Sequence, residues 1–170
     1  MQKSYPVPLS FRVFPFYVEE TKFNSSNQDQ ASTILFYDDM LEALNEPNSK
    51  PWFESTTHVP ELFVQWKETI DDLNELYSKR DRKAAKPVMI RMVAQLIQAI
   101  YWTNHVPVTN LEQLELHINQ LHYKPVNISE RIAFIRREPD HFHSYNQLKA
   151  LFEETEKMYY RSLTQKDLSI

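Results

Sequence analysis

The sequence of 170 residues contains no glycine and no cysteine. Walker A loops, dinucleotide-binding G-x-G-x-x-G turns and the G-x-S-x-G nucleophile elbow all need glycine, because their backbones take positive φ or approach a ligand closely. The absence of cysteine excludes disulfides, cysteine-based zinc sites and thiol nucleophiles, and it is typical of a cytoplasmic protein. A chain without glycine is most easily built from helices joined by Pro, Asn and Ser turns.

Long apolar runs are missing as well. No stretch approaches the roughly 20 residues of a membrane span, so we expect no membrane association. The first twenty residues include Arg12 and three prolines and lack the apolar core of a signal peptide, which again favours the cytoplasm. The apolar fraction of 42% and the aromatic fraction of 13% are those of a globular protein, and the length suits one domain.

The net charge of −4 is unevenly distributed along the chain. Residues 1–78 carry five basic and thirteen acidic side chains, whereas residues 79–86, KRDRKAAK, carry five basic side chains and one acidic. Basic and acidic residues balance in the remainder. Proteins that bind nucleic acid over most of their surface are usually basic overall, and this one is acidic.

The residues that do occur predict an all-α fold. Residues 1–30 form an extended arm rich in proline and aromatic residues, of which 25–30 are polar, and residues 31–170 form the helical domain. Apolar spacing predicts a first helix from about Ser32, a second from Pro60, and a third from Pro87 that is apolar over most of its circumference and hence central. We therefore expect a single compact bundle of about six helices.

Three capping boxes predict where the last three helices begin. In each box a Ser, Thr or Asn is followed three residues later by Glu or Gln, so that two side chains satisfy free N–H groups at a helix start. The boxes begin at Thr109, Asn127 and Ser144. Ser144 is thus interpreted as a helix cap and not as a nucleophile. Asn104, at the end of the central helix, is the expected left-handed C-cap.

Residues Val88 to Arg161 resemble the YpoC-like family of Gram-positive bacteria. The resemblance rests on Ile100-Tyr101-Trp102-Thr103-Asn104 with Pro107-Val108, on Lys124-Pro125-Val126-Asn127 before Glu130-Arg131, and on Phe134-Ile135, Pro139 and the His143–Leu148 stretch. It implies a helical, cytoplasmic bacterial protein whose gene lies near genes for replication, DNA repair and a cell-wall synthase. It implies no activity and no catalytic residues.

The stretch His141-Phe142-His143 is the one candidate for metal chemistry. In an extended segment, His-x-His places both imidazoles on one side, and Asp140, His117 or His122 would have to complete the ligand set. The alternative is a helix start at which these residues assist capping. We favour the second interpretation and predict no catalytic residue, no bound metal and no cofactor.

Two sets of basic residues are candidates for binding. Arg131, Arg136 and Arg137 either bind a partner's phosphate or carboxylate through their planar guanidinium groups or balance helix-end charge. Together with His141, His143 and Tyr145 they form a hypothetical binding face at the joint of the last two helices. The second set contacts nucleic-acid phosphates or is simply a solvated helix end. It comprises Lys79, Arg80, Arg82, Lys83 and Lys86, with Arg91 nearby.

Three hypotheses of function follow from these features. The first is a non-catalytic interaction protein with a protein partner, favoured by the missing catalytic motifs and the segregated charge. The second is a nucleic-acid-associated accessory factor that uses residues 79–91 and the arginines. The third is a metal-dependent enzyme centred on His141 and His143. A further hypothesis is that Trp102 and His105 line a binding pocket. The alternative, which is commoner for these residue types, is that their rings pack in the core while their polar edges form hydrogen bonds. The sequence leaves the partner and the oligomeric state open.

Overall fold

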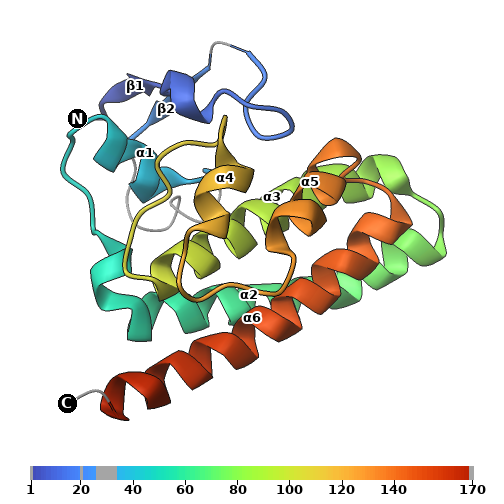
Figure 1. Ribbon diagram of the computed structural model, residues 1–170. Coiled ribbons are helices and arrows are strands. Elements are labelled where there is room, and N and C mark those ends of the chain that lie inside the picture. Colours follow the sequence, from blue (N-terminus) through green and yellow to red (C-terminus); the bar gives the residue numbers. More distant parts are fainter. Residues whose placement is uncertain (1, 20, 26–33, 169–170) are drawn as a thin grey trace.

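The computed structural model describes residues 2–19, 21–25 and 34–168, with the side chains of 166–168 excepted. Three long helices form the body of the fold: α2 (Ser55–Ser78), α3 (Arg82–Thr103) and α6 (Phe142–Leu168), each in contact with the other two. The shorter helices α1 (Tyr37–Ala43), α4 (Leu114–Asn119) and α5 (Ile128–Arg137) lie above them together with the N-terminal arm (Figure 1). The expected all-α fold with about six helices is confirmed.

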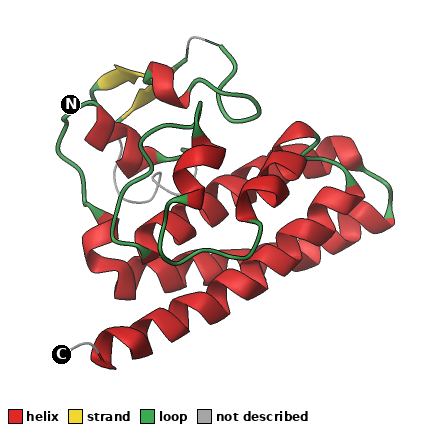
Figure 2. Cartoon of the chain, in the orientation of Figure 1, coloured by secondary structure: helices red, strands yellow, loops and turns green. Residues whose placement is uncertain are grey.

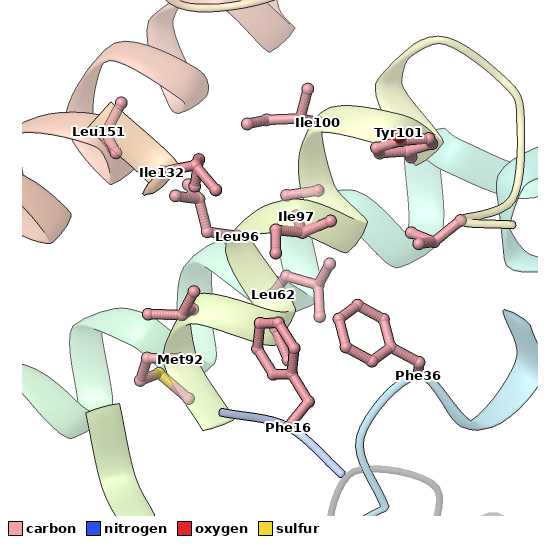
Figure 3. Packing of buried hydrophobic residues seen from close by; sticks show 14 of the residues in the cluster. Phe16, Phe36, Leu62, Met92, Leu96, Ile97, Ile100, Tyr101, Ile132 and Leu151 are labelled. Carbon is pink, nitrogen blue, oxygen red and sulfur yellow. The ribbon is translucent and has the colours of Figure 1, made fainter. Parts of the chain in front are cut away.

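The central position of α3 is confirmed by its burial. Every residue from Met92 to Thr103 is buried, because α2 and α6 flank this helix while the arm, α1 and the short helices cover it. Figure 3 shows Phe16 of the arm and Phe36 beside the α2 and α3 side chains of this core, Leu62 and Ile97 among them. The two phenylalanine rings meet edge to face at 5.2 Å, an arrangement that aromatic rings favour.

The arm is more regular than an extended segment. Strands β1 (Ser4–Pro6) and β2 (Lys22–Asn24) pair antiparallel, with Tyr5 opposite Phe23 (Figure 2). A short 3-10 helix, Leu9–Phe11, follows β1 and buries Phe11 completely. The aromatic rings therefore anchor the arm to the bundle, as their apolar character indicates. Most of the predicted polar stretch 25–30, and the predicted helix start at Ser32, lie outside the described residues.

Several helix boundaries differ from the prediction. A 3-10 turn, Pro51–Glu54, leads into α2 five residues before Pro60, and α3 begins five residues before Pro87. Both prolines therefore sit in the second turn, where the missing N–H costs only one hydrogen bond to the carbonyl four residues earlier. The start of α3 is instead fixed by Asp81, whose carboxylate accepts a hydrogen bond from the Ala84 N–H at 3.1 Å.

The predicted capping boxes are wrong in detail. Helix α4 begins at Leu114 rather than at Thr109. Helix α5 begins at Ile128, directly after Asn127 as predicted, although the Asn127 side chain forms no cap. Helix α6 begins two residues before Ser144, whose buried hydroxyl donates to the Glu138 carbonyl at 2.6 Å. The Ser144 hydroxyl therefore bonds to the turn before α6 and does not cap that helix.

Six of the described residues take a left-handed backbone although none is glycine. They are Phe36, Asn45, Lys50, Arg80, His105 and Asn127. The left-handed residue after α3 is His105, so the prediction of Asn104 is wrong in this respect. The Asn104 side chain instead donates to the Ile100 and Tyr123 carbonyls at 2.8 Å and so holds the segment before α5 against α3. In the part of the chain that the structure describes, no helix has both the length and the apolar character needed to cross a bilayer.

Candidate functional site

Two connections that are far apart in sequence lie side by side at one end of the bundle. The turn between α2 and α3 (79–81) and the turn between α5 and α6 (138–141) meet there (Figure 1). Asp140 joins them, because its carboxylate pairs with Arg82 at 3.1 Å and its carbonyl accepts a hydrogen bond from the Tyr77 hydroxyl at 3.0 Å. The basic turn between α2 and α3 and the region of His141, which belong to the two predicted binding sets, therefore meet on one surface.

We call this surface the joint surface and define it by its exposed residues. These are Lys79, Arg80, Arg82, Lys83, Lys86, Arg137 and His143, together with Phe142 and the half-buried His141. Four side chains have no ion-pair or hydrogen-bond partner among described residues, namely those of Arg80, Lys83, Lys86 and Arg137. Lys79 pairs with Glu75 at 2.7 Å, and His141 contacts the Glu138 carboxylate. The surface thus carries free cations as well as paired ones.

Phe142 provides the apolar part of the joint surface. Its side chain is 53% exposed in the first turn of α6, and its ring meets the Tyr77 ring at 5.8 Å. Behind it, Tyr145 stacks on Tyr77 at 4.9 Å and donates a hydrogen bond to Asn74. Tyr145 is only 1% exposed, and burial raises its pKa to about 12. It therefore supports the surface from inside and does not belong to it, contrary to the predicted binding face.

The three arginines of α5 have separate surroundings. Arg131 forms a two-pronged ion pair with Glu154 of α6, at 2.7 and 2.9 Å, and Arg136 pairs with Glu115 of α4 at 2.8 Å. The Arg136 guanidinium also lies 6.0 Å from the centre of the Phe16 ring. Arg131 and Arg136 therefore join helices to one another and to the arm. Of the three, Arg137 alone contributes to the joint surface.

The predicted metal ligands do not have the geometry on which the prediction depended. His143 lies in the first turn of α6 and His141 immediately precedes that helix. Side chains two positions apart on a helix point in different directions, whereas the prediction needed an extended segment. Among the described residues, no group of three or more His, Asp or Glu side chains gathers in a way that suits a metal ion.

A pocket of about 350 Å³ lies between α2 and α3 and is closed by residues near α1. Its polar side chains repeat at helical spacing on both walls, a pattern that the apolar character of the central helix obscured in the sequence. The lining residues are Ile34, Leu35, Tyr37, Asp38, Ser49, Pro51, His58, Glu61, Leu62, Gln65, Arg91, Ala94, Gln95, Gln98 and Trp102. The sequence analysis noted Arg91 and Trp102 but missed Gln95 and Gln98. These two glutamines could have been found as polar residues within the otherwise apolar sequence of α3.

Asp39, next to this pocket, is a fully buried carboxylate. It accepts hydrogen bonds from the Gln98 amide at 2.8 Å, the Trp102 indole at 3.1 Å and the Val108 backbone N–H at 2.8 Å. Burial raises the pKa of Asp39 to about 6, although the three hydrogen bonds oppose that rise. Its neighbour Asp38 bonds to Ser49 instead. Asp39 therefore ties α1 to α3 and to the segment before α4.

A smaller pocket of about 220 Å³ brings Ser55 near His105. The Ser55 hydroxyl lies 3.4 Å from His105 Nδ1, a separation that invites comparison with a nucleophile and its base. However, Nδ1 also lies 3.3 Å from the Trp52 carbonyl, which only accepts hydrogen bonds. With the proton on Nδ1, this nitrogen donates to the Trp52 carbonyl and has no lone pair with which to activate the serine.

Comparison with known proteins places the chain in a family. The family described as YpoC-like protein matches residues 56–167, which adds most of α2 to the resemblance expected over 88–161. The uncharacterized protein YpoC of Bacillus subtilis strain 168 is 31% identical over 111 residues, which are 65% of this chain and 68% of the relative. No solved structure matches. The match covers more than half of the chain, including α2 to α5 and nearly all of α6, and the protein belongs to the YpoC-like family.

Proposed function

We propose that the protein is a non-catalytic, cytoplasmic interaction protein that binds an acidic surface of a partner protein through its joint surface. The observation that carries the proposal is the convergence at Asp140. It brings the free cations of the α2–α3 turn and the exposed ring of Phe142 to one place. Exposed aromatic rings and arginines are among the residue types that dominate binding energy in protein interfaces.

Carboxylates within the joint surface favour a protein partner over nucleic acid. Glu75 pairs with Lys79, Asp140 pairs with Arg82, and Glu138 contacts His141. Asp81 lies between Arg80 and Arg82 in the sequence. A continuous phosphate backbone would be repelled by these groups, whereas a protein can place its own charges to match both signs. The free cations still give the surface an excess of positive charge, so the matching partner surface is mainly acidic, with an apolar recess for Phe142.

One observation supports nucleic acid as the second candidate. The sequence around residues 79–86 lacks aromatic residues for base stacking, but the fold supplies Phe142 beside it. An exposed ring next to free lysines and arginines is the arrangement that binds single strands. This candidate predicts binding to single-stranded DNA or RNA that weakens steeply as salt increases.

The test is an affinity capture from lysate at low and high salt, with and without nuclease, using the wild type and Lys83→Glu. Lys83 is exposed in the first turn of α3, where an acidic side chain is compatible with the helix dipole, so the variant is expected to fold. Arg161→Glu is the matched control. It reverses the charge of another exposed cation, and Arg161 lies in the C-terminal part of α6, whereas the joint surface includes the N-terminal start of that helix.

Two results separate the candidates. A protein that survives nuclease, is retained by Arg161→Glu and is lost with Lys83→Glu supports the proposed function. Material that disappears after nuclease treatment identifies nucleic acid as the partner instead. If Lys83→Glu captures every protein that the wild type captures, the joint surface is not the binding site and the proposal fails.

A further inference from the structure

The pocket between α2 and α3 contains a charge that the fold does not use. Arg91 is half-buried in its wall and makes no ion pair or hydrogen bond with any described residue. The other charged groups there are engaged, because Asp38 accepts two hydrogen bonds from Ser49, at 3.1 Å each, and Glu61 contacts His58 at 3.3 Å. A partly desolvated guanidinium without a partner is unfavourable, and an anion entering the pocket would relieve that cost.

Amide groups next to Arg91 add further donors. The Gln65 carbonyl oxygen accepts a hydrogen bond from the Gln95 amide at 2.8 Å, so that both N–H groups of Gln65 are left for a ligand. Gln95 is only 5% exposed, and its own carbonyl oxygen is buried without a partner among the described residues. Buried amides of this kind are normally fully bonded. The N–H groups of Gln65 suit an anionic head group, whereas the free Gln95 oxygen is an acceptor and suits an N–H or O–H group elsewhere on a bound molecule.

Part of the lining is apolar. Leu35, Pro51, Leu62 and Ala94 line the pocket together with the ring of Trp102. Its volume of about 350 Å³ lies at the lower end of the range of small-molecule sites, which is about 300–1,000 Å³. The ligand that fits has an apolar body and an anionic head. Because Asp38 and Glu61 also line the pocket, a singly charged carboxylate meets less repulsion there than a doubly charged phosphate.

We propose that this pocket binds a small organic carboxylate with an apolar body, and that Arg91 forms the ion pair with its head group while Gln65 donates to it. The site is separate from the joint surface, since its walls are the facing sides of α2 and α3 and not their connecting turn. It does not depend on the proposed function and can be tested independently.

The test uses the full-length protein, labelled with ¹⁵N, and two-dimensional NMR. The probes are phenylacetate, 3-phenylpropionate and indole-3-acetate, the three corresponding carboxamides, and 2-phenylethyl phosphate. We expect at least one carboxylate to shift the Trp102 indole and Gln65 amide signals saturably. We expect its carboxamide to bind at least tenfold more weakly, because the amide lacks the charge.

Arg91→Gln is the decisive variant, and Arg161→Gln on the exposed side of α6 is its control. Arg91 has no partner in the described part of the chain, so Arg91→Gln is expected to unfold at the wild-type temperature. It should weaken carboxylate binding at least tenfold and abolish the preference over the carboxamide, while Arg161→Gln changes neither. The proposal is overturned if no carboxylate shifts those signals, if Arg91→Gln binds as the wild type does, or if the phosphate binds more tightly than every carboxylate.

Discussion

Arg82 on α3 and Asp140 before α6 form an ion pair of 3.1 Å between residues that are 58 positions apart in the sequence. The Arg82 side chain is half exposed, so the pair contributes little to stability, about 0–1 kcal/mol. Its importance is positional. Together with the hydrogen bond from Tyr77 to the Asp140 carbonyl, it fixes the basic α2–α3 turn beside Phe142 and so creates one surface from two segments.

The hydrogen bonds of Asp39 predict a large difference between two substitutions. Asp39→Ala leaves the Trp102 indole and the Val108 N–H buried without an acceptor, so we expect the free energy of unfolding to fall by about 3–5 kcal/mol. Asp39→Asn keeps one acceptor oxygen, and the Gln98 amide can rotate to accept from the new N–H₂ group. Urea unfolding of both variants at pH 7 measures the difference. Equal losses would show that the buried hydrogen bonds contribute little.

The pKa of Asp39 predicts a pH dependence with a definite sign. Burial raises this pKa from 3.8 in the unfolded chain to about 6 in the folded protein, so the folded state binds the proton more tightly. The contribution of this group is therefore fully present below pH 4 and is lost as the pH rises through about 6. Relative to the wild type, Asp39→Asn should gain about 2–3 kcal/mol between pH 4 and pH 7. Urea unfolding at the two pH values tests this, and a constant difference between the two proteins contradicts it.

The ion pair of Arg131 and Glu154 predicts that lysine is a poor replacement for arginine here. Arg131→Lys keeps the charge but loses the two parallel hydrogen bonds to Glu154 and the one to Gln147. We expect a loss of about 1 kcal/mol in the free energy of unfolding, measured in urea. Lys157, whose pair with Glu153 is exposed on both sides, is the control, and Lys157→Gln should change stability by less than about 0.5 kcal/mol. Similar losses in the free energy of unfolding for the two variants would be evidence against a special role for the paired hydrogen bonds of the guanidinium group.

The backbone of Arg80 predicts a substitution that stabilises the fold while weakening binding. Arg80 follows the end of α2 with a φ of 57°, and the Asp81 N–H bonds back to the Leu76 carbonyl at 2.9 Å, an arrangement that normally uses glycine. Arg80→Gly should raise the free energy of unfolding by about 0.5–1 kcal/mol, because it relieves the steric cost of the left-handed backbone. The same change removes a free cation from the joint surface. A less stable protein, or one that binds its partner as before, would contradict the prediction.

The sequence predicted the parts of the fold that depend on periodicity. The apolar residues of α3 identified the central helix because burial on all sides leaves a continuous apolar pattern. Helix starts were predicted less well, since they depend on contacts that sequence does not show. Ser144 occurs in a capping pattern, yet its hydroxyl bonds to Glu138 within a turn that only the fold creates. Nothing local indicated that Arg80 and His105 take left-handed backbones in place of glycine.

The sequence identified residues of the candidate sites but not how these residues are arranged in space. The basic run at 79–86 and the region of His141 were both identified, whereas their meeting through Asp140 requires the crossing of α2, α3 and α6. Tyr145 has the composition of an interface residue, but its ring fills the space behind Tyr77. Asp39 was not identified as a candidate, and its burial becomes evident only when α1 packs on α3.

The most direct test of the joint surface compares Phe142→Ala with Tyr160→Ala. Both rings lie on α6 and are about half exposed, at 53% and 51%, so the two variants remove similar exposed apolar surface at different places. Quantitative mass spectrometry would measure each protein captured by the two variants and the wild type, after nuclease treatment. A central aromatic residue of an interface contributes about 2 kcal/mol or more, so at least one captured protein should fall by about thirtyfold with Phe142→Ala and remain with Tyr160→Ala. Equal capture of every protein by the two variants would contradict a binding function of the joint surface.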